Sequence, residues 1–183
     1  MVEVRFYDTV NDELLKFAVI ISQSNGKWVF CKHKERDTYE VPGGHREAGE
    51  NILETAKREL QEETGAIKFE IKPICVYSVT GKTRVNDTGE ETFGLLYFAE
   101  ITEFTKELHS EMEKVVLMDK LPENWTYPEI QPRLLEEARQ RGFLPKKDEI
   151  KWLFFDVGST LIDESRVYED RMKKIAELSG ITP

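Results

Sequence analysis

The stretch from Gly44 to Ala66 constrains the fold and function of this chain more than any other part of its sequence. It holds Gly44, then Glu50, then the acidic run Arg58-Glu59-Leu60-Gln61-Glu62-Glu63-Thr64-Gly65-Ala66. In a helix, Glu59 and Glu63 are one turn apart and Glu62 lies within the same narrow arc. Like charges at this spacing weaken a helix, whereas Mg²⁺ or Mn²⁺ prefers clustered carboxylate oxygens. The run therefore predicts either a solvated acidic face or a divalent metal site.

The ends of this helix can also be predicted from the sequence. Glu54 and Thr55 belong to its first turns, and Gly65 can take the left-handed conformation that follows a last turn. Before the helix, Pro42-Gly43-Gly44 predicts a turn with bare backbone. A carbonyl of such a turn can approach a metal ion closely.

The spacing of Gly44, Glu50 and the acidic run resembles the Nudix box of the Nudix hydrolases. Every fixed position of that box is matched, although Ala66 stands where the family more often has a bulkier aliphatic residue. The resemblance covers residues 1–143 and implies an α/β/α sandwich around a mixed β-sheet. Strand-like segments on both sides of one helix, with a second helix near the end, favour the same α/β class.

The resemblance implies a metal-dependent pyrophosphohydrolase that cleaves a nucleoside diphosphate linked to another group, X. Bound metal would neutralise phosphate charge, lower the pKa of a water and stabilise the leaving oxygen. Among the branches of the family we expect a nucleoside triphosphate substrate, oxidised forms included, as in 8-oxo-dGTP diphosphatases. Hydrolysis of ADP-ribose or of a dinucleoside polyphosphate is an alternative, as is a Nudix module that senses a nucleotide without cleaving it.

The resemblance also assigns roles within the acidic helix. It implies that Glu59, Glu62 and Glu63 are Mg²⁺ or Mn²⁺ ligands, with the carbonyl of Gly43 or Gly44 as a further ligand. Arg58 is expected to hold Glu50 or to orient Glu59.

A proton acceptor for the attacking water is needed as well, and two carboxylates are candidates. Glu59 could serve, or Glu111 from a later loop. The alternative is that Glu107, Glu111 and Glu113 simply form a solvated acidic loop. His33 and His45 lack the partner spacing of a zinc site.

Substrate-binding residues are less constrained. Lys32 or Arg5 could meet a phosphate, or could be ordinary surface cations. A nucleobase could stack on Tyr39, Trp125 or Tyr127, and Asn124 could read its edge. The reason is that some members of the family that act on oxidised purine nucleotides place an aromatic residue and an amide in the loop before the last helix. The aromatic residues could equally pack the last helix onto the sheet.

Composition limits the partners and the compartment. A net charge of −9 argues against long nucleic acid, which requires a basic face, but not against a small anionic substrate carried by metal. Cys31 and Cys75 lie in apolar runs and are expected to be buried free thiols in a reducing cytosol. We predict a cytoplasmic protein, because the N-terminus lacks the apolar region of a signal peptide and no apolar run spans a bilayer.

The remaining elements are predicted from hydrophobic pattern and turn residues. Residues 2–7 alternate like an edge strand, and Asn25-Gly26 predicts a hairpin turn. Further segments are predicted as strands over 17–21, 27–31, 67–79 with a break at Pro73, 92–101 and 115–118, and as a helix over 134–141.

Residues 144–183 are expected to form a linker and a second motif. Lys151 to Asp163 resembles the first motif of haloacid-dehalogenase-type hydrolases, in which Asp156 would be the nucleophile. Gly158 departs from that motif, and the sequence stops at Pro183 before the rest of that fold, so we expect a truncated segment without phosphatase activity. The apolar strand 152–155 is expected to dock on the Nudix domain or on a second copy, which would give a homodimer.

Overall fold

The computed structural model describes residues 2–34, 36–83, 86–105, 112–145 and 173–175. The chain divides into two units, Met1–Lys146 and Lys147–Pro183. In the second unit only one helical turn, residues 173–175, is described. The strand predicted around Asp156 and the candidate base Glu111 both lie outside the described residues.

A mixed β-sheet forms the centre of the first unit. In the described residues it has eight strands, with the order β1-β6-β7-β2-β3-β4, while β5 pairs with β2 and β8 with β3. The pair β2–β7 is parallel and the other pairs are antiparallel. The strands are β1 (Glu3–Tyr7), β2 (Leu15–Ser24), β3 (Lys27–His33), β4 (Tyr39–Glu40), β5 (Gly43–His45), β6 (Ala66–Thr80), β7 (Thr92–Phe104) and β8 (Met112–Met118).

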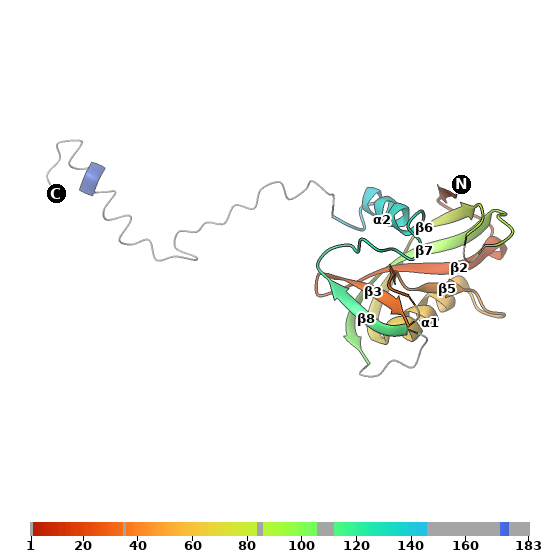
Figure 1. Cartoon of the computed structure of the whole chain (residues 1–183), viewed down its shortest axis with the longest axis horizontal. Coiled ribbons are helices and arrows are strands. Elements are labelled where there is room, and N and C mark those ends of the chain that lie inside the picture. Colours follow the sequence, from red (N-terminus) through yellow and green to blue (C-terminus); the bar gives the residue numbers. More distant parts are fainter. Residues whose placement is uncertain (1, 35, 84–85, 106–111, 146–172, 176–183) are drawn as a thin grey trace. The chain divides into compact units, whose positions relative to one another are not determined.

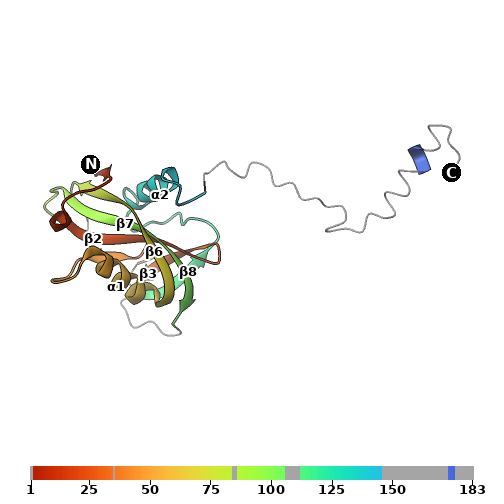
Figure 2. The same ribbon diagram turned by 180° about the vertical axis from the view of Figure 1, so that it is seen from behind.

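Two helices cover opposite faces of this sheet (Figures 1 and 2): α1 (Ile52–Thr64) and α2 (Gln131–Gln140). Successive residues of one strand point to opposite faces, so each strand supplies both cores. Ile20 packs in the cluster that contains Leu60 of α1, and Ile21 packs in the cluster that contains Leu134 of α2. The predicted α/β/α sandwich is therefore confirmed.

Several predicted elements are confirmed in detail, and two need correction. Asn25 and Gly26 both have positive φ, at 51° and 74°, as a hairpin turn of the predicted kind requires. β6 does not break at Pro73 but runs through it, with a register shift between Pro73 and Cys75. Proline is tolerated there because β1 pairs with β6 only from Val76 onward. α2 begins earlier than predicted, at Gln131, because Pro132 suits the first turn of a helix.

Caps fix both ends of α1. The Asn51 side chain accepts hydrogen bonds from the Leu53 and Glu54 N–H groups, and the Glu54 carboxylate accepts one from the Asn51 N–H. Gly65 is left-handed at the other end, with φ 69°, as predicted. The capping box was not predicted, although Asn51-x-x-Glu54 is a recognisable signal for one.

Asn51→Ala should lower the free energy of unfolding by about 0.5–2 kcal/mol, because two helix N–H groups lose their acceptor. Urea denaturation measures this change. Asn51→Ser, which keeps an acceptor, is the matched control. An alanine variant as stable as the serine variant would contradict the proposed role of the cap.

Both cysteines are buried and free, as predicted. The core cluster that contains Leu134 of α2 continues past this helix to Leu144, which is 4% exposed. In the described part of the chain, no helix is long and apolar enough to cross a membrane.

Candidate active site

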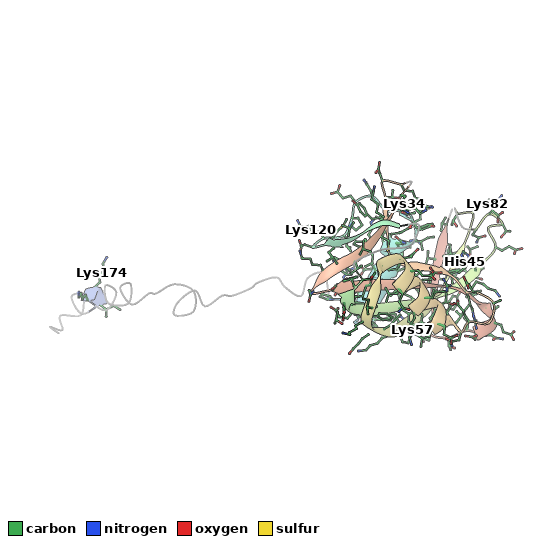
Figure 3. The ribbon with its side chains drawn as sticks, turned by 90° about the horizontal axis from the view of Figure 1, so that it is seen from below. Lys34, His45, Lys57, Lys82, Lys120 and Lys174 are labelled. Carbon is green, nitrogen blue, oxygen red and sulfur yellow. The ribbon has the colours of Figure 1, made fainter. Side chains whose placement is uncertain are left out.

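Strand β5 carries the glycine turn against α1. Its register pairs Ala18 with Gly44 and Val19 with Gly43, so β2 holds the two glycines in place. Figure 3 labels His45, the last residue of β5, whose carbonyl accepts a hydrogen bond from Arg58 Nη2 at 3.0 Å. Two segments that the sequence places apart therefore meet at the acidic face of α1.

The Glu63 carboxylate is hydrogen-bonded to this turn. Its Oε2 accepts a hydrogen bond from the Gly43 N–H at 2.9 Å. The pKa of Glu63 is raised to about 8, with burial as the largest cause. The hydrogen bond from the Gly43 N–H opposes this rise, and the neighbouring charges of Glu59 and Glu40 add to it. A buried carboxyl whose charged form is disfavoured is a group that a divalent cation would stabilise in its ionised state.

Gly44 makes room for Glu59. A Cβ on Gly44 would lie 2.0 Å from Oε1 of Glu59, so any larger residue would collide with this carboxylate. The Glu59 side chain is 12% exposed. Burial raises its pKa, while the hydrogen bond from Arg58 opposes that rise.

One guanidinium, that of Arg58, connects the acidic residues. Its Nε contacts Glu50 at 2.6 Å, and its Nη1 contacts Glu59 at 2.8 Å and Glu62 at 3.2 Å. The hydrogen bond from Arg58, followed by one from the Glu47 N–H, lowers the pKa of Glu50 to about 2. Both contacts expected of Arg58, to Glu50 and to Glu59, are therefore present together.

Within the described ranges, no three Asp, Glu, His or Cys side chains converge on a metal-sized position. Glu59 and Glu62 form ion pairs with Arg58, whereas Glu63 accepts a hydrogen bond from the Gly43 N–H. The donor set nevertheless fits a hard divalent cation, because it consists of carboxylates on one helix face beside bare glycine backbone. Glu50 is fully engaged by Arg58, Thr55 and the Glu47 N–H.

A cavity of about 300 Å³ opens beside Glu63 and the two glycines. Its lining includes the carboxylates of Glu40 and Glu63, and combines aromatic and aliphatic side chains with a similar number of polar and charged ones. The lining residues are Lys16, Phe17, Val19, His33, Arg36, Glu40, Val41, Gly43, Gly44, His45, Glu63, Tyr77, Val79, Thr83, Asn86, Thr92, Tyr127, Ile130, Gln131 and Leu134. A concave pocket that combines apolar walls with polar groups is the usual form of a small-molecule site.

Of the predicted substrate-binding residues, the structure brings only Tyr127 to this cavity. Lys32 lies 3.4 Å from Asp37, and Arg5 pairs with Glu3 on the edge strand β1. Neither of these cations is among the lining residues.

Tyr39, Asn124 and Trp125 also lie outside the lining. Trp125 packs edge-on against Phe30, with ring centroids 5.4 Å apart, in the core beneath α2. The backbone of Tyr39 joins this loop to the sheet through hydrogen bonds with Asn124 and Thr126. For Trp125, this packing matches the alternative of an aromatic plug.

Most of the polar residues that line the cavity were not predicted from the sequence. Arg36 and Glu40 contact each other at 3.5 Å, and Gln131 stands at the start of α2. Glu40 is buried just before the Pro-Gly-Gly turn. The sequence signal that could have identified it is a carboxylate within an otherwise strand-like segment. Gln131 carried no comparable signal.

Comparison with known proteins places the chain in a family. The NUDIX domain matches residues 13–146. The chain therefore belongs to the Nudix hydrolases, a family of enzymes that generally need a divalent metal.

Two similar proteins come from Bacillus subtilis. The curated relative "Putative 8-oxo-dGTP diphosphatase YtkD" (strain 168) is 36% identical over 124 residues, which cover 67% of this chain and 74% of the relative. The crystal structure of the pyrophosphohydrolase BsRppH, in a mutant form, is 29% identical with a TM-score of 0.63, and the match covers 78% of this chain and 92% of that chain. A UDP-X diphosphatase structure shares the fold at 20% identity and a TM-score of 0.57, over 74% of this chain and 64% of that chain.

Proposed function

We propose that this chain is a metal-dependent pyrophosphohydrolase that cleaves a nucleoside triphosphate, oxidised forms included, to the monophosphate and pyrophosphate. The observation that carries the proposal is the contact between the glycine turn and the acidic helix. Gly43 and Gly44 meet Glu63 and Glu59 at the end of a cavity of about 300 Å³. The names of the two Bacillus subtilis relatives, a diphosphatase and a pyrophosphohydrolase, support the same reaction class.

We assign the metal ligands to Glu59, Glu62 and Glu63, with the Gly43 carbonyl as a further ligand. Bound Mg²⁺ or Mn²⁺ would lower the pKa of a water and neutralise phosphate charge. Arg58 is a positioning residue, because its guanidinium contacts Glu50, Glu59 and Glu62 and so fixes their spacing.

The proton acceptor for the attacking water is assigned to Glu59 or Glu111. Burial makes Glu59 a stronger base than a solvated glutamate, because it raises the pKa of this group. Glu59→Gln and Glu111→Gln, compared in single-turnover assays over a range of pH, separate the two candidates, because loss of the base removes the acidic limb of the pH–rate profile, where the rate rises as the base loses its proton.

A substrate panel tests the proposed reaction. Purified protein should release pyrophosphate from dGTP or 8-oxo-dGTP with Mg²⁺ or Mn²⁺, and EDTA should abolish this release. ADP-ribose and dinucleoside polyphosphates complete the panel. Cleavage of either of these alone would replace the proposed substrate, and binding of nucleotides without cleavage of any would indicate a sensing module.

We propose the same division of the chain that the sequence suggests, with a Nudix domain over 1–143 and a linker with a haloacid-dehalogenase-like segment over 144–183. A cytoplasmic location and a homodimer formed through the tail belong to this proposal. Light scattering of the full chain and of a chain ended at Lys146 tests the dimer. The cut belongs after Lys146, because Leu144 is buried in the core of the first unit. Asp156→Asn should leave phosphomonoester hydrolysis at background.

A further inference from the structure

We propose that Arg46 is a positioning residue that holds Glu50 in place and, through Glu50, fixes Arg58 against the proposed metal ligands. The proposal rests on the proposed function, since it concerns the same acidic helix. The feature that carries it is a guanidinium that joins the turn before α1 to a distant part of the chain. Arg46 stands within residues 45–49, which the spacing of the Nudix box leaves open, so the box itself gives it no role.

The Arg46 side chain connects Glu50 to η1, a 3-10 turn over Asp12–Leu14. Its Nε donates to the Glu50 carbonyl at 2.7 Å, and its Nη1 donates to the Asp12 carbonyl at 2.9 Å. Its Nη2 forms an ion pair with the Asp12 carboxylate at 2.8 Å. The backbone N–H of Arg46 donates to the Lys16 carbonyl of β2 at 2.8 Å. Arg46 therefore anchors the turn before α1 both to β2 and to η1.

The turn that Arg46 begins, residues 46–50, closes around Glu50. The Glu50 N–H donates to the Glu47 carbonyl at 3.2 Å, and the Glu50 carboxylate accepts a hydrogen bond from the Glu47 N–H at 3.0 Å. Gly49 takes a left-handed conformation within it, with φ 92°. Because Arg46 holds the Glu50 carbonyl, it fixes the direction in which the Glu50 side chain leaves this turn.

The Glu50 carboxylate connects this turn to the acidic helix. Its Oε1 accepts a hydrogen bond from Arg58 Nε at 2.6 Å, and its Oε2 accepts one from Thr55 Oγ1 at 2.8 Å. Arg58 in turn contacts Glu59 and Glu62, which we assign as metal ligands. Mutation of groups that orient metal ligands typically costs about 10–100-fold in metal affinity or activity. A shift of the turn should therefore reach the reaction through Glu50 and Arg58.

The arrangement requires a guanidinium and not simply a positive charge. The planar fork of arginine reaches two carbonyls and a carboxylate at once, whereas the ammonium of lysine is a compact point charge. The Asp12 carboxylate is 61% exposed, so its ion pair with Arg46 contributes little by itself. We therefore expect the effect to come from the bonds to the two backbone carbonyls.

Arg46→Met and Arg46→Lys test this assignment in the full chain. The solvent exchange rate of the Arg58 Nε–H, measured by NMR on the metal-free protein, should rise by about 10-fold in both variants, on the scale of one charge-assisted hydrogen bond. In Mg²⁺ assays kcat should fall by about 10-fold with little change in KM, because Arg46 is not among the residues that line the cavity. Unchanged exchange in Arg46→Met, or full recovery in Arg46→Lys, would overturn the assignment.

Arg139→Met is the matched control, because Arg139 makes the same kinds of contact on α2. Its Nη1 pairs with the Glu136 carboxylate at 2.6 Å, and its Nε donates to the Pro145 carbonyl at 3.1 Å. Loss of Arg139 should lower the Tm while the exchange of Arg58 and kcat stay unchanged. Equal changes in Arg46→Met and Arg139→Met would indicate general loosening of the protein and would overturn the assignment.

A double-mutant cycle with Glu50→Gln tests whether Arg46 acts through Glu50. Once the carboxylate is removed, its direction no longer matters, so adding Arg46→Met should lower kcat by less than about 2-fold. Losses that multiply in the double variant would show that Arg46 acts by another route and would overturn the proposal.

The exchange measurement keeps this test separate from that of the proposed reaction, because it needs neither substrate nor metal. If the wild-type protein cleaves no triphosphate, the proposed function fails. Faster exchange of the Arg58 Nε–H in Arg46→Met, with no change in Arg139→Met, would then still support the assignment. Unchanged exchange in Arg46→Met would overturn it.

Discussion

Glu63→Gln should lower kcat/KM for the triphosphate substrate by about 10²–10³-fold, a loss of at least ~3 kcal/mol of transition-state stabilisation. The Glu63 side chain is partly buried, lines the cavity and accepts a hydrogen bond from the Gly43 N–H. Glutamine keeps an acceptor for that N–H and removes the charge that would bind the cation. The fold should therefore persist while the reaction is lost.

Stability measurements sharpen this prediction. Since burial disfavours the charged form of Glu63, the metal-free variant should unfold at the same or a higher temperature than the wild-type protein. Mg²⁺ should raise the Tm of the wild-type protein and have a much smaller effect on the variant, because a ligand stabilises only a protein that binds it.

Glu70→Gln is the control for the change in net charge. Its side chain is 83% exposed on β6, and its replacement should change neither activity nor the response to Mg²⁺. Full activity in Glu63→Gln, with the Mg²⁺ response retained, would remove Glu63 from the proposed metal site.

Gly44→Ala should abolish most of the activity at a small cost in stability. The new Cβ would lie 2.0 Å from Oε1 of Glu59 and 2.6 Å from its Oε2, so the carboxylate must leave its position. The carboxylate is the far end of a flexible side chain, and the backbone need not move. A displacement of about 1 Å at a reacting centre can cost about 10²-fold in rate, which is the loss we expect in kcat.

Gly43→Ala, one residue earlier, should have the opposite profile and is the matched comparison. Its Cβ would lie 2.5 Å from the Ala18 carbonyl oxygen and 3.0 Å from the Val19 Cα, both backbone atoms of β2. We expect a loss of about 1–3 kcal/mol in the free energy of unfolding, as for overpacked sites. Denaturant unfolding and steady-state kinetics on both variants separate the effects. Equal losses of stability in the two variants would contradict this account of the turn.

The fold and the acidic helix could be predicted because their signals are local. The spacing from Arg58 to Gly65 defines one helix face and one cap, and apolar runs define the strands. Gly44 lies against Glu59 although the two residues are 15 positions apart. The spacing of the Nudix box had already paired these two positions.

The cavity beside Glu63 could not be predicted in the same way. Its wall combines residues from β2, β4, β6 and the start of α2, which only the folded sheet brings together. Trp125 and Gln131 lie six positions apart, yet the first fills the core and the second lines the cavity. Residue type favoured Trp125 as a base-contacting group, whereas in the structure its ring packs against Phe30.

The guanidinium of Arg58 gives the acidic helix an internal counterion. Because it already neutralises part of the charge of Glu59 and Glu62, an incoming cation has to compete with it for both carboxylates. At the proposed metal site, Arg58 would thereby favour weak, rapidly exchanging metal over permanently retained metal. The occupancy of this enzyme would then follow the free Mg²⁺ concentration around it.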